Sequence, residues 1–468
     1  MFSVLPDPAR HPVRFLSLWA VVYFLLLLPS LDNSFPYMGD ESFYTVSAMN
    51  MLQRGDFLSP WYEGAYRFNK PILAYWTVLA GYLAFGVSMW SGRVPTLLLS
   101  LATLALTYRL GAAVTGDRRK GVLAALVLSS SYLFMSSSRI AMTDPLLALF
   151  TTAALFFYAR MCISPDRPLP WAAAAAVACG LGCLSKGPAG LLPLGGLLVY
   201  LAVARPARAG RLAWSALHPV NGIILSLVVA PWYLYAAAAH PQAFAANMHS
   251  ESHVMRQFFT PGAALGRLVF YLATLAGAFL PFSVAAIVGA IRNRPGRGIL
   301  RSLPGCFALL GLAVFVAGVQ IHKDRYLLPL LPAIAVVFAD LITGERWKRW
   351  LAAAAAVCVL QGAVLAAYPL VSHEELRALV HLWKRECAGT LGFDLDPRSA
   401  GWGRLYANDR NLALPAAARF VIVSTADLPR YAGWRTLGTA SRISAVTWEH
   451  GGLEIVRRTC LLLERPRA

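Results

Sequence analysis

The chain has 468 residues, of which 57% are hydrophobic and 14% are charged, and its mean hydropathy is +0.55. A chain of this size with so little polar surface cannot fold as a soluble globule, so the composition predicts a polytopic membrane protein. The formal net charge of +19 does not indicate nucleic-acid binding, because membrane proteins carry excess Lys and Arg in cytoplasmic loops and beside anionic lipids.

The first apolar segment, residues 15–31, follows Arg10 and Arg14 and has no small-residue cleavage site. It predicts an uncleaved membrane span whose N-terminus lies in the cytoplasm. The polar segment 37–71 then lies on the outer side of the membrane. It holds acids and bases against flanking apolar spans, where they are costly, and this favours a functional site.

Residues 71–88 are as long as a short span, but their aromatic residues, glycines and early proline leave their placement open. Thirteen Lys and Arg residues lie in four later loops, at 116–120, 205–211, 292–301 and 344–349. These loops face the cytoplasm only if 71–88 does not cross the membrane. We therefore expect 71–88 to lie at the outer interface, within an outer loop that covers residues 37–92.

Ten further apolar segments predict spans, which gives eleven in total. They lie near residues 93–114, 121–139, 144–162, 171–186, 188–204, 219–239, 266–291, 303–320, 326–342 and 349–369. The predicted fold is thus an α-helical polytopic membrane protein, with a membrane domain at residues 1–371.

The odd number of spans places residues 372–468 outside the cytoplasm. A helical pattern and short apolar segments there predict a small α/β domain.

The seven cysteines show no zinc-type spacing, and five of them fall in or beside predicted spans. Cys387 and Cys460 lie in the C-terminal part, where they could form a disulfide outside the cytoplasm.

In this topology, ionisable side chains from six connections share the outer membrane face. They are Asp40, Glu41, Lys70, Arg139, Asp144, Lys186, His249, Glu251, His253, His322, Lys323, Asp324 and Arg325. A cavity formed there by several helix ends could hold a charged headgroup while its lipid tail stays in the membrane.

Asp40 follows Gly39 and opens a predicted interfacial helix. It could cap that helix, with Glu41 favoured by the helix dipole. Alternatively, Asp40 is a general base, because a carboxylate at a partly dry interface has a raised pKa and can accept a proton from a hydroxyl. The two roles are compatible.

Lys70 precedes Pro71, which favours an extended backbone that projects the lysine from the end of the loop. It could snorkel to the interface or bind a phosphate. Arg139 and Asp144 bracket a short turn, where Asp144 could cap the next helix or face the cavity. Lys186 could mark an outer turn or supply a second phosphate contact.

In a helix, His249 and His253 share a face and Glu251 points away, whereas in a strand all three align. They could bind substrate or a metal, although the spacing is not HExxH, or simply be interfacial side chains. Lys323 and Arg325 lie in the motif HKDRY at the start of a span, where phosphate or sugar contacts are expected.

Seven motifs occur in an order that resembles membrane glycosyltransferases of the GT-C type, in the protein O-mannosyltransferase-like superfamily. They are MGDESFY, GDFLSPWYEGAYRFNKPILAYW, FGVSMWSGRVP, SRIAMTDPLLALF, LGCLSKGPAGLL, ESHVMRQF and HKDRYLLPLLPAIA. Within that group the chain is most similar to the bacterial lipid A aminoarabinose transferases, and the resemblance covers most of residues 10–345.

The resemblance implies sugar transfer from an undecaprenyl-phosphate or related polyprenyl-phosphate donor to lipid A, another glycan or a protein. The reaction would occur at the bacterial inner membrane, in a site facing the periplasm. It also implies that Asp40 is the base or acceptor-orienting acid, with Glu41 beside it. Lys70 then lies near the donor phosphate, Asp144 is the second acid of the cavity, and His253 is the histidine of a Glu-His pair.

Two positions depart from the pattern of the aminoarabinose enzymes. Asn69 stands where those enzymes tend to have Glu, and Ser252 separates Glu251 from His253. The eleven predicted spans are also fewer than the thirteen typical of that group. The identities of the sugar and the acceptor therefore stay open.

The expected mechanism is a single inverting displacement. Asp40 orients or deprotonates the acceptor. The charge that grows on the departing phosphate is offset by Lys70, with Arg139, Lys186, Lys323 and Arg325 as further candidates for phosphate binding. No cofactor is required and a divalent metal is optional, since the chain has no P-loop or GxGxxG and phosphate is already a good leaving group.

The alternative function is a lipid-linked sugar flippase or transporter. Transporters typically have paired halves and charges at mid-membrane, and neither is found in the sequence.

Overall fold

The structure is a computed structural model of the chain. It describes residues 7–32, 39–164, 166–257, 264–292, 297–318, 323–344, 347–371, 375–395, 407, 412–413, 415–449 and 452–466.

The first half of the chain is helical apart from one small hairpin. Its elements are α1 (Pro12–Leu27), η1 (Leu28–Asp32), η2 (Gly39–Glu41), α2 (Ser42–Arg54), β1 (Trp61–Tyr62), β2 (Ala65–Tyr66), α3 (Leu73–Phe85), α4 (Met89–Thr115), α5 (Arg118–Ser129), α6 (Tyr132–Ser137), α7 (Thr143–Ile163), α8 (Pro168–Lys186), η3 (Gly187–Leu191), α9 (Leu192–Ala204), α10 (Ala209–Ala216) and α11 (Pro219–Ala239).

The second half continues with helices and ends in a sheet. Its elements are α12 (Pro241–Gln257), α13 (Ala264–Ala278), α14 (Phe282–Arg292), α15 (Arg297–Leu300), α16 (Leu303–Gly318), η6 (Asp324–Leu330), α17 (Leu331–Ile342), α18 (Trp347–Val371), α19 (Glu375–Glu386), β3 (Leu391–Asp394), β4 (Phe420–Ser424), η7 (Thr425–Tyr431), β5 (Arg435–Glu449) and β6 (Gly452–Glu464).

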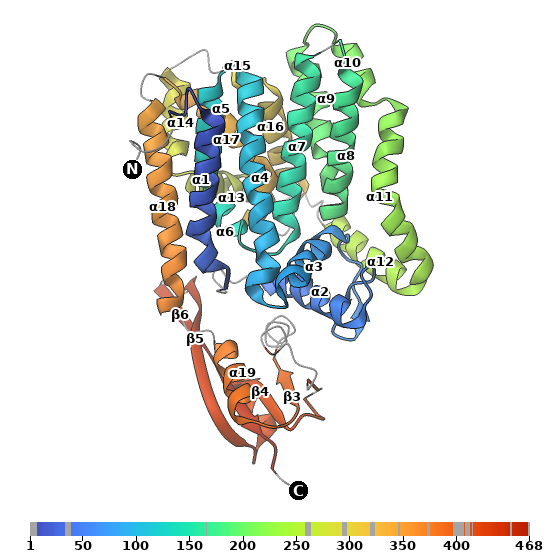
Figure 1. Cartoon of the computed structure of the whole chain (residues 1–468), viewed down its shortest axis with the longest axis vertical. Coiled ribbons are helices and arrows are strands. Elements are labelled where there is room, and N and C mark those ends of the chain that lie inside the picture. The colour runs from blue at the N-terminus through green and yellow to red at the C-terminus, as the bar shows by residue number, and fades with distance from the viewer. Residues whose placement is uncertain are drawn as a thin grey trace.

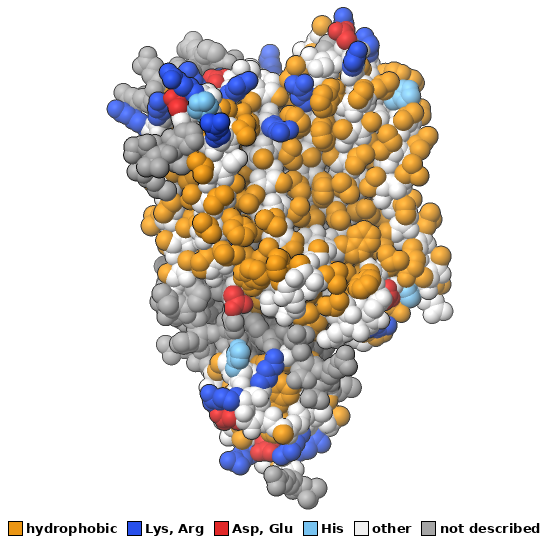
Figure 2. All heavy atoms as spheres, viewed as in Figure 1, with side chains coloured by type: hydrophobic (Ala, Val, Ile, Leu, Met, Phe, Trp, Pro, Cys, Tyr) orange, Lys and Arg blue, Asp and Glu red, His pale blue; other side chains and the backbone are white. Residues whose placement is uncertain are grey.

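The long helices stand side by side in a bundle, and the C-terminal sheet with α19 lies beyond one end of it (Figure 1). A broad band of hydrophobic side chains covers the visible face of the bundle (Figure 2). Helices α11, α13 and α14 expose large apolar side chains: Leu227 is 69% exposed, Leu265 74% and Ile291 73%. This exposure suits contact with lipid and not with water. The protein is therefore a multi-pass membrane protein.

Seven described helical segments are long and apolar enough to cross a membrane. They are Pro12–Asp32, Met89–Thr115, Thr143–Ile163, Pro168–Ala204, Ala209–Ala239, Asp324–Ile342 and Trp347–Ala367, and the bent pair α13 and α14, which meet at 106°, would be an eighth. Each of the eleven predicted segments falls on described helices, but their number as crossings stays a prediction.

The difference in count has physical causes in particular segments. A Cβ on Gly190 would lie 2.3 Å from the backbone nitrogen of Cys183, whereas a straight helix would separate these positions by about 10 Å. The chain therefore reverses at η3, and Pro168–Ala204 is two helices, as predicted. The predicted span 121–139 is broken between α5 and α6, and α16 has only 16 residues.

The predicted interfacial segment forms α3, a helix of 13 residues. Its length of about 20 Å is too short for a hydrocarbon core of about 30 Å. A Cβ on Gly81 of α3 would lie 1.9 Å from the carbonyl oxygen of Ser91 on α4, so the two helices are in backbone contact. With α2, α3 lies at the end of the bundle that faces the C-terminal sheet (Figure 1).

The basic loops gather at the opposite end of the bundle. Figure 1 places the beginnings of α5 and α18, together with α10 and α15, away from the C-terminal sheet, and Figure 2 shows Lys and Arg side chains clustered there. The predicted separation of basic loops from the outer loop is thus present in the described structure.

The C-terminal part is a small α/β unit, as predicted. Four strands lie in the order β3-β4-β6-β5, with β3 parallel to β4 and the other pairs antiparallel. Helix α19 packs on β5 and β6, and Leu379, Val380 and Trp383 on this helix are buried. The division of the chain at residue 371 stays a prediction.

The predicted disulfide between Cys387 and Cys460 is wrong, because neither cysteine forms a disulfide in the structure. Arg419 donates hydrogen bonds to the carbonyl oxygen of Ala388, next to Cys387, and to Glu464, at the far end of β6. Four residues of strand separate Glu464 from Cys460, which is about 13 Å. A disulfide needs Cα atoms within about 7 Å, so the sheet holds these thiols apart.

Candidate active site

Asp40 lies in η2, directly before α2. Figure 1 shows α2 at the end of the bundle that faces the C-terminal sheet. Its carboxylate accepts hydrogen bonds from Arg325, through Nη2, and from Lys323, whose Nζ lies 3.1 Å from Oδ2. The N-cap position of α2 is occupied by Glu41 and not by Asp40, which differs from the capping alternative for Asp40. Asp40 instead joins η2 to η6 across more than 280 positions of sequence.

The two cations reverse the expected effect of the interface on Asp40. Burial raises the pKa of Asp40, but the hydrogen bond and charge of Arg325 and the charge of Lys323 outweigh it and lower the pKa to about 2. The prediction of a raised pKa was therefore wrong. In this state Asp40 is a stable carboxylate and a weak proton acceptor.

Asp144, at the start of α7, is the second carboxylate of the cluster and is only 3% exposed. It forms an ion pair with Lys186 at the end of α8, and its Oδ2 lies 3.9 Å from Nε of Arg325. The N-cap of α7 is Met142, so Asp144 lies inside the first turn and not at the capping position. Arg325 thus lies between the two carboxylates.

Lys186 also connects the cluster to the outer loop. Its Nζ lies 4.5 Å from the ring centroid of Tyr326, and the charge of Lys70 acts on it. The structure therefore brings together six predicted site residues from five segments of the chain. They are Asp40, Lys70, Asp144, Lys186, Lys323 and Arg325.

These six residues supply four cations and two carboxylates. The side chains of Lys186 and Lys323 are 21% and 37% exposed, while Arg325 is 11% exposed. A partly exposed group with an excess of positive charge can bind an anion without leaving a carboxylate unpaired. The cluster therefore suits an anionic headgroup presented at the membrane face.

Glu41 is separate from this cluster. Its two carboxylate oxygens accept hydrogen bonds from Nε and Nη2 of Arg93 at 2.7 and 2.6 Å, and the backbone N–H of Ala141 donates to Oε1 at 2.8 Å. Glu41 and Arg93 are both at most 1% exposed. Glu41 therefore ties η2 to α4 and to the turn before α7, and this position argues against the predicted catalytic contact with substrate.

Arg139 is also enclosed within the protein, with no exposed surface. Its Nη1 donates to the carbonyl oxygen of Ser30 at 2.9 Å, which joins the turn after α6 to η1. A side chain in this position cannot contact a lipid-linked phosphate without a rearrangement. The predicted phosphate-binding role of Arg139 is not supported by its location.

The predicted metal or substrate residues lie on α12. His249 is exposed on this helix, while the side chains of Glu251 and His253 lie outside the described part of the chain. The backbone of Pro241–Gln257 is helical, which is the first of the two predicted alternatives. Among the described residues, no group of three or more His, Cys, Asp and Glu side chains is placed to hold a metal ion.

Arg93 is the main residue that the sequence analysis missed. An arginine inside the apolar helix α4 is a strong signal for a buried partner, but the sequence could not identify Glu41 as that partner.

His240 and Asn247 are two further residues that the sequence analysis missed. Nε2 of His240 lies 2.9 Å from the hydroxyl of Ser59, and Asn247 accepts from the backbone N–H of Phe68 at 3.1 Å. They anchor the loop that leads to Lys70.

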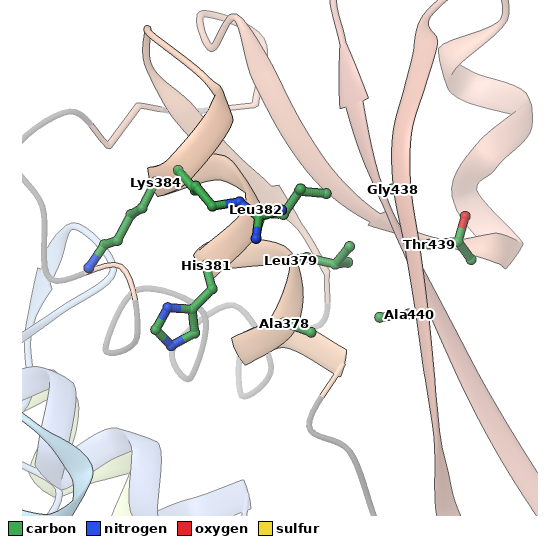
Figure 3. A pocket seen from close by; sticks show the side chains of 9 residues that line it. Ala378, Leu379, His381, Leu382, Lys384, Gly438, Thr439 and Ala440 are labelled. Atoms are coloured by element: carbon green, nitrogen blue, oxygen red, sulfur yellow. The ribbon is translucent and has the colours of Figure 1, made fainter.

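A cavity of about 580 Å³ lies apart from the ion-pair cluster, in the C-terminal unit. Figure 3 shows it between α19 and β5, with the side chains of His381 and Lys384 projecting from the helix. Its lining residues include Arg385 and residues 438–440 but no carboxylate. It shares no residue with the cluster around Asp40.

A family model described as "Dolichyl-phosphate-mannose-protein mannosyltransferase" matches residues 13–246. An uncharacterised protein of Aquifex aeolicus is 30% identical over 340 residues, which cover 70% of this chain and 65% of that protein. The undecaprenyl phosphate-alpha-4-amino-4-deoxy-L-arabinose arabinosyl transferase 1 of Sodalis glossinidius is 26% identical, over 83% of this chain and 70% of that protein.

The fold is similar to that of ArnT from Cupriavidus metallidurans, whose crystal structure has undecaprenyl phosphate bound. The TM-score is 0.72 at 16% sequence identity, and the match covers 96% of this chain and 98% of that chain. The likeness extends through the helical bundle into the C-terminal unit. At this identity it establishes the fold, which is of the GT-C type.

The chain spans 65% of the length of the Aquifex relative and 60% of the corresponding transferase of Edwardsiella ictaluri. The family match covers half of the 468 residues and includes four of the six residues of the cluster, namely Asp40, Lys70, Asp144 and Lys186. The chain therefore belongs to the dolichyl-phosphate-mannose-protein mannosyltransferase family, with the GT-C fold of ArnT.

Proposed function

We propose that this protein transfers a sugar from a polyprenyl-phosphate donor, of the undecaprenyl-phosphate type, to an acceptor at the outer face of the membrane. Family membership supports this activity, as do the relatives named as undecaprenyl-phosphate aminoarabinose transferases and the lipid bound in the ArnT structure. The observation that carries the proposal is the excess of cations around Asp40 and Asp144.

The cations match the charge that develops in this reaction. A polyprenyl-phosphate sugar is a phosphodiester with one negative charge, and the released polyprenyl phosphate carries up to two. Lys70, Lys186, Lys323 and Arg325 can offset this added charge in a partly dry site, where such contacts are strongest. They therefore stabilise the leaving group more than the bound donor, which accelerates transfer.

The reaction is a single displacement with inversion at the anomeric carbon. A hydroxyl of the acceptor loses its proton to Asp40, and its oxygen forms the new bond to the anomeric carbon. The bond between that carbon and the phosphate oxygen breaks, and its electron pair leaves with the polyprenyl phosphate. Asp40 later releases the proton to water.

Asp40 must gain basicity before it can accept this proton. Arg325 and Lys323 hold its pKa near 2, and both are also candidates for the donor phosphate. A phosphate that draws these cations away leaves Asp40 less strongly paired, and its pKa then rises toward the ordinary value. Donor binding would thus prepare the base for the acceptor.

The reaction as proposed needs no cofactor, since the chain's own cations offset the charge of the phosphate. A divalent metal stays an optional addition, with His249, Glu251 and His253 on α12 as its candidate ligands. A transfer assay with and without EDTA distinguishes the two cases, because a required metal makes the activity sensitive to the chelator.

For location, we propose the bacterial inner membrane, with the cluster and residues 372–468 on the periplasmic side. The basic loops at the opposite end of the bundle support this orientation. The acceptor is lipid A, another glycan or a protein. The departures at Asn69 and Ser252 leave the sugar open, so the product must be identified by its mass.

The test compares wild type with Asp40→Asn in envelope-bearing cells. Mass spectrometry of lipid A, surface glycans and polyprenyl-phosphate sugars would show an added sugar on one acceptor with wild type only. Loss of the base is expected to reduce transfer by about 10²- to 10⁴-fold and to leave the lipid-linked donor accumulated.

The matched control is Asp166→Asn, which removes a carboxylate from an exposed ion pair with Arg208 at the basic end. Its glycan profile should equal that of wild type. If Asp40→Asn also gives the wild-type profile at equal expression, the proposed role of Asp40 is wrong. If wild type adds no sugar to any acceptor, the transferase proposal fails and transport of the lipid-linked sugar becomes the leading explanation.

A further inference from the structure

The β1–β2 hairpin is a short element of the outer loop, and three residues separate its last residue, Tyr66, from Lys70. Trp61 pairs with Tyr66, and Tyr62 pairs with Ala65. The two residues between the strands, Glu63 and Gly64, have φ of 49° and 86°, as the mirror-image turns of two-residue hairpins require. The backbone N–H of Arg67 donates to the carbonyl oxygen of Pro60 at 2.8 Å and extends the ladder.

Strand alternation gives this hairpin two different faces. On one face, the guanidinium of Arg54 lies 4.1 Å from the ring centroid of Trp61, and the tilted rings of His240 and Tyr66 have their centroids 4.0 Å apart. On the other face, the guanidinium of Arg67 lies 3.8 Å from the ring centroid of Phe43, on α2. The hairpin thus carries one stacked arginine on each side.

Lys186, Lys323 and Arg325 form ion pairs with Asp40 or Asp144, and Arg67 differs from them in this respect. Its side chain makes no ion pair and no hydrogen bond within the described part of the chain, and its Nε is buried without a hydrogen-bond partner. A guanidinium has five N–H donors, and leaving buried donors unpaired is costly. The stacking on Phe43 fixes its plane while leaving its in-plane donors for an oxyanion.

Phe43, on which Arg67 stacks, follows Asp40 by three residues, and Arg67 itself precedes Lys70 by three residues. Burial raises the pKa of the Tyr44 hydroxyl, on which the charges of Arg67 and Asp144 act in opposite directions. One phenol ring therefore lies within electrostatic range of both Arg67 and Asp144. Arg67 thus lies beside the chain segments that carry Asp40 and Lys70.

We propose that Arg67 is a substrate-binding residue that donates hydrogen bonds to a phosphate oxygen, from a position separate from the Asp40–Arg325 pair. This inference rests on the proposed function, because it assigns Arg67 to the same site. The phosphate belongs either to the polyprenyl donor or to a phosphorylated acceptor such as lipid A. Arginine suits this contact because its planar fork binds phosphate oxygens in pairs.

The experiment measures binding to the purified full-length protein in detergent, without requiring sugar transfer. One arm uses undecaprenyl phosphate as the ligand, and the other compares lipid A with enzymatically dephosphorylated lipid A. The variants are Arg67→Gln, which removes the charge, and Arg67→Lys, which keeps the charge but loses the fork. The control is Arg54→Gln, because Arg54 stacks on the other face of the same hairpin.

The expected result is at least about tenfold weaker binding to Arg67→Gln in one arm, a smaller loss with Arg67→Lys and wild-type affinity with Arg54→Gln. Loss with undecaprenyl phosphate identifies the donor phosphate. Loss with lipid A but not with its dephosphorylated form identifies the acceptor phosphate.

The inference is overturned if Arg67→Gln binds every ligand as wild type does. It is also overturned if Arg54→Gln weakens binding as much as Arg67→Gln, since both changes would then act through the hairpin alone. These binding measurements do not depend on catalysis. A protein that binds phosphate through Arg67 but transfers no sugar would therefore refute the proposed function, while the assignment of Arg67 would stand.

Discussion

Asp40 and Glu41 are neighbours in the chain, but their partners give them different roles. Asp40 pairs with Lys323 and Arg325 at the edge of the bundle and keeps 18% of its side chain exposed. Glu41 turns inward to Arg93 and has no exposed surface. One carboxylate is therefore accessible to a ligand, while the other holds the backbone around it in place.

The first prediction concerns the buried pair of Glu41 and Arg93. Glu41→Gln leaves the Arg93 charge buried without its carboxylate, so we expect a loss of about 3–5 kcal/mol in the free energy of unfolding. The double variant Glu41→Gln/Arg93→Met should recover part of this loss. Thermal unfolding in detergent measures the stability of the single and the double variant. If Glu41→Gln keeps wild-type stability but fails to transfer sugar, the result would instead indicate direct catalysis by Glu41.

The second prediction concerns the pH dependence of Asp40. Its pKa in the folded protein is about 2, below the ordinary 3.8. The ionised form therefore stabilises the folded state above about pH 4, and this stabilisation is lost as the pH falls toward 2. We expect a contribution of about 2 kcal/mol at neutral pH, and unfolding of wild type and Asp40→Asn should show a difference that shrinks between pH 5 and 2. A constant difference over this range would contradict the pairing.

At the scale of elements, the site depends on helix ends that meet although they are distant in sequence. Helices α7 and α8 supply Asp144 and Lys186, while η6 supplies Lys323 and Arg325. The reversal at η3 lets α8 end at this face and α9 return, and it requires close backbone contact at Gly190. The geometry of the cluster is therefore set by turns as much as by charged residues.

The third prediction concerns Gly190→Ala. Its Cβ would lie 2.3 Å from the backbone nitrogen of Cys183 and 2.5 Å from the carbonyl carbon of Gly182, and backbone atoms cannot move aside cheaply. We expect a loss of about 1–3 kcal/mol in stability and reduced transfer, because α8 and α9 must separate and Lys186 shifts from Asp144. Gly222→Ala is the control, since its Cβ would meet no atom within 4 Å. Equal stability and activity of Gly190→Ala and wild type would refute this account.

For the whole molecule, the distribution of charge is the main feature. Lys and Arg gather at one end of the apolar band, while the ion-pair cluster, α2, α3 and the C-terminal unit lie toward the other (Figures 1 and 2). From this asymmetry we expect the membrane to hold the protein with its basic end in the cytoplasm. The proposed orientation would decide which compartment supplies the substrates.

The fourth prediction concerns this orientation. Alkaline phosphatase fused after residue 468 should be active, because the C-terminal unit is expected in the periplasm, where the enzyme forms its disulfides. Green fluorescent protein fused after Arg208 in a truncated chain should fluoresce, since this loop is expected in the cytoplasm. The opposite pattern for both fusions would reverse the proposed topology and remove the cluster from the periplasmic face.

The sequence by itself was sufficient for the class of protein, the helical segments and most of the charged cluster. Hydropathy over about 20 residues identifies membrane helices, and the positions of Lys and Arg give their orientation, because both are properties of local sequence. The short α3 and the small C-terminal α/β unit were recognisable for the same reason. The motifs also pointed to the family.

Only the tertiary structure decided what each charged side chain does. Arg93 had to be brought to Glu41 across 52 positions of sequence to show that this carboxylate is enclosed, and Arg325 had to be brought to Asp40 to show that its pKa is lowered. Burial and pairing depend on contacts between distant segments, so composition and spacing cannot determine them. The separation of Cys387 from Cys460 was likewise fixed by strand register and not by the count of cysteines.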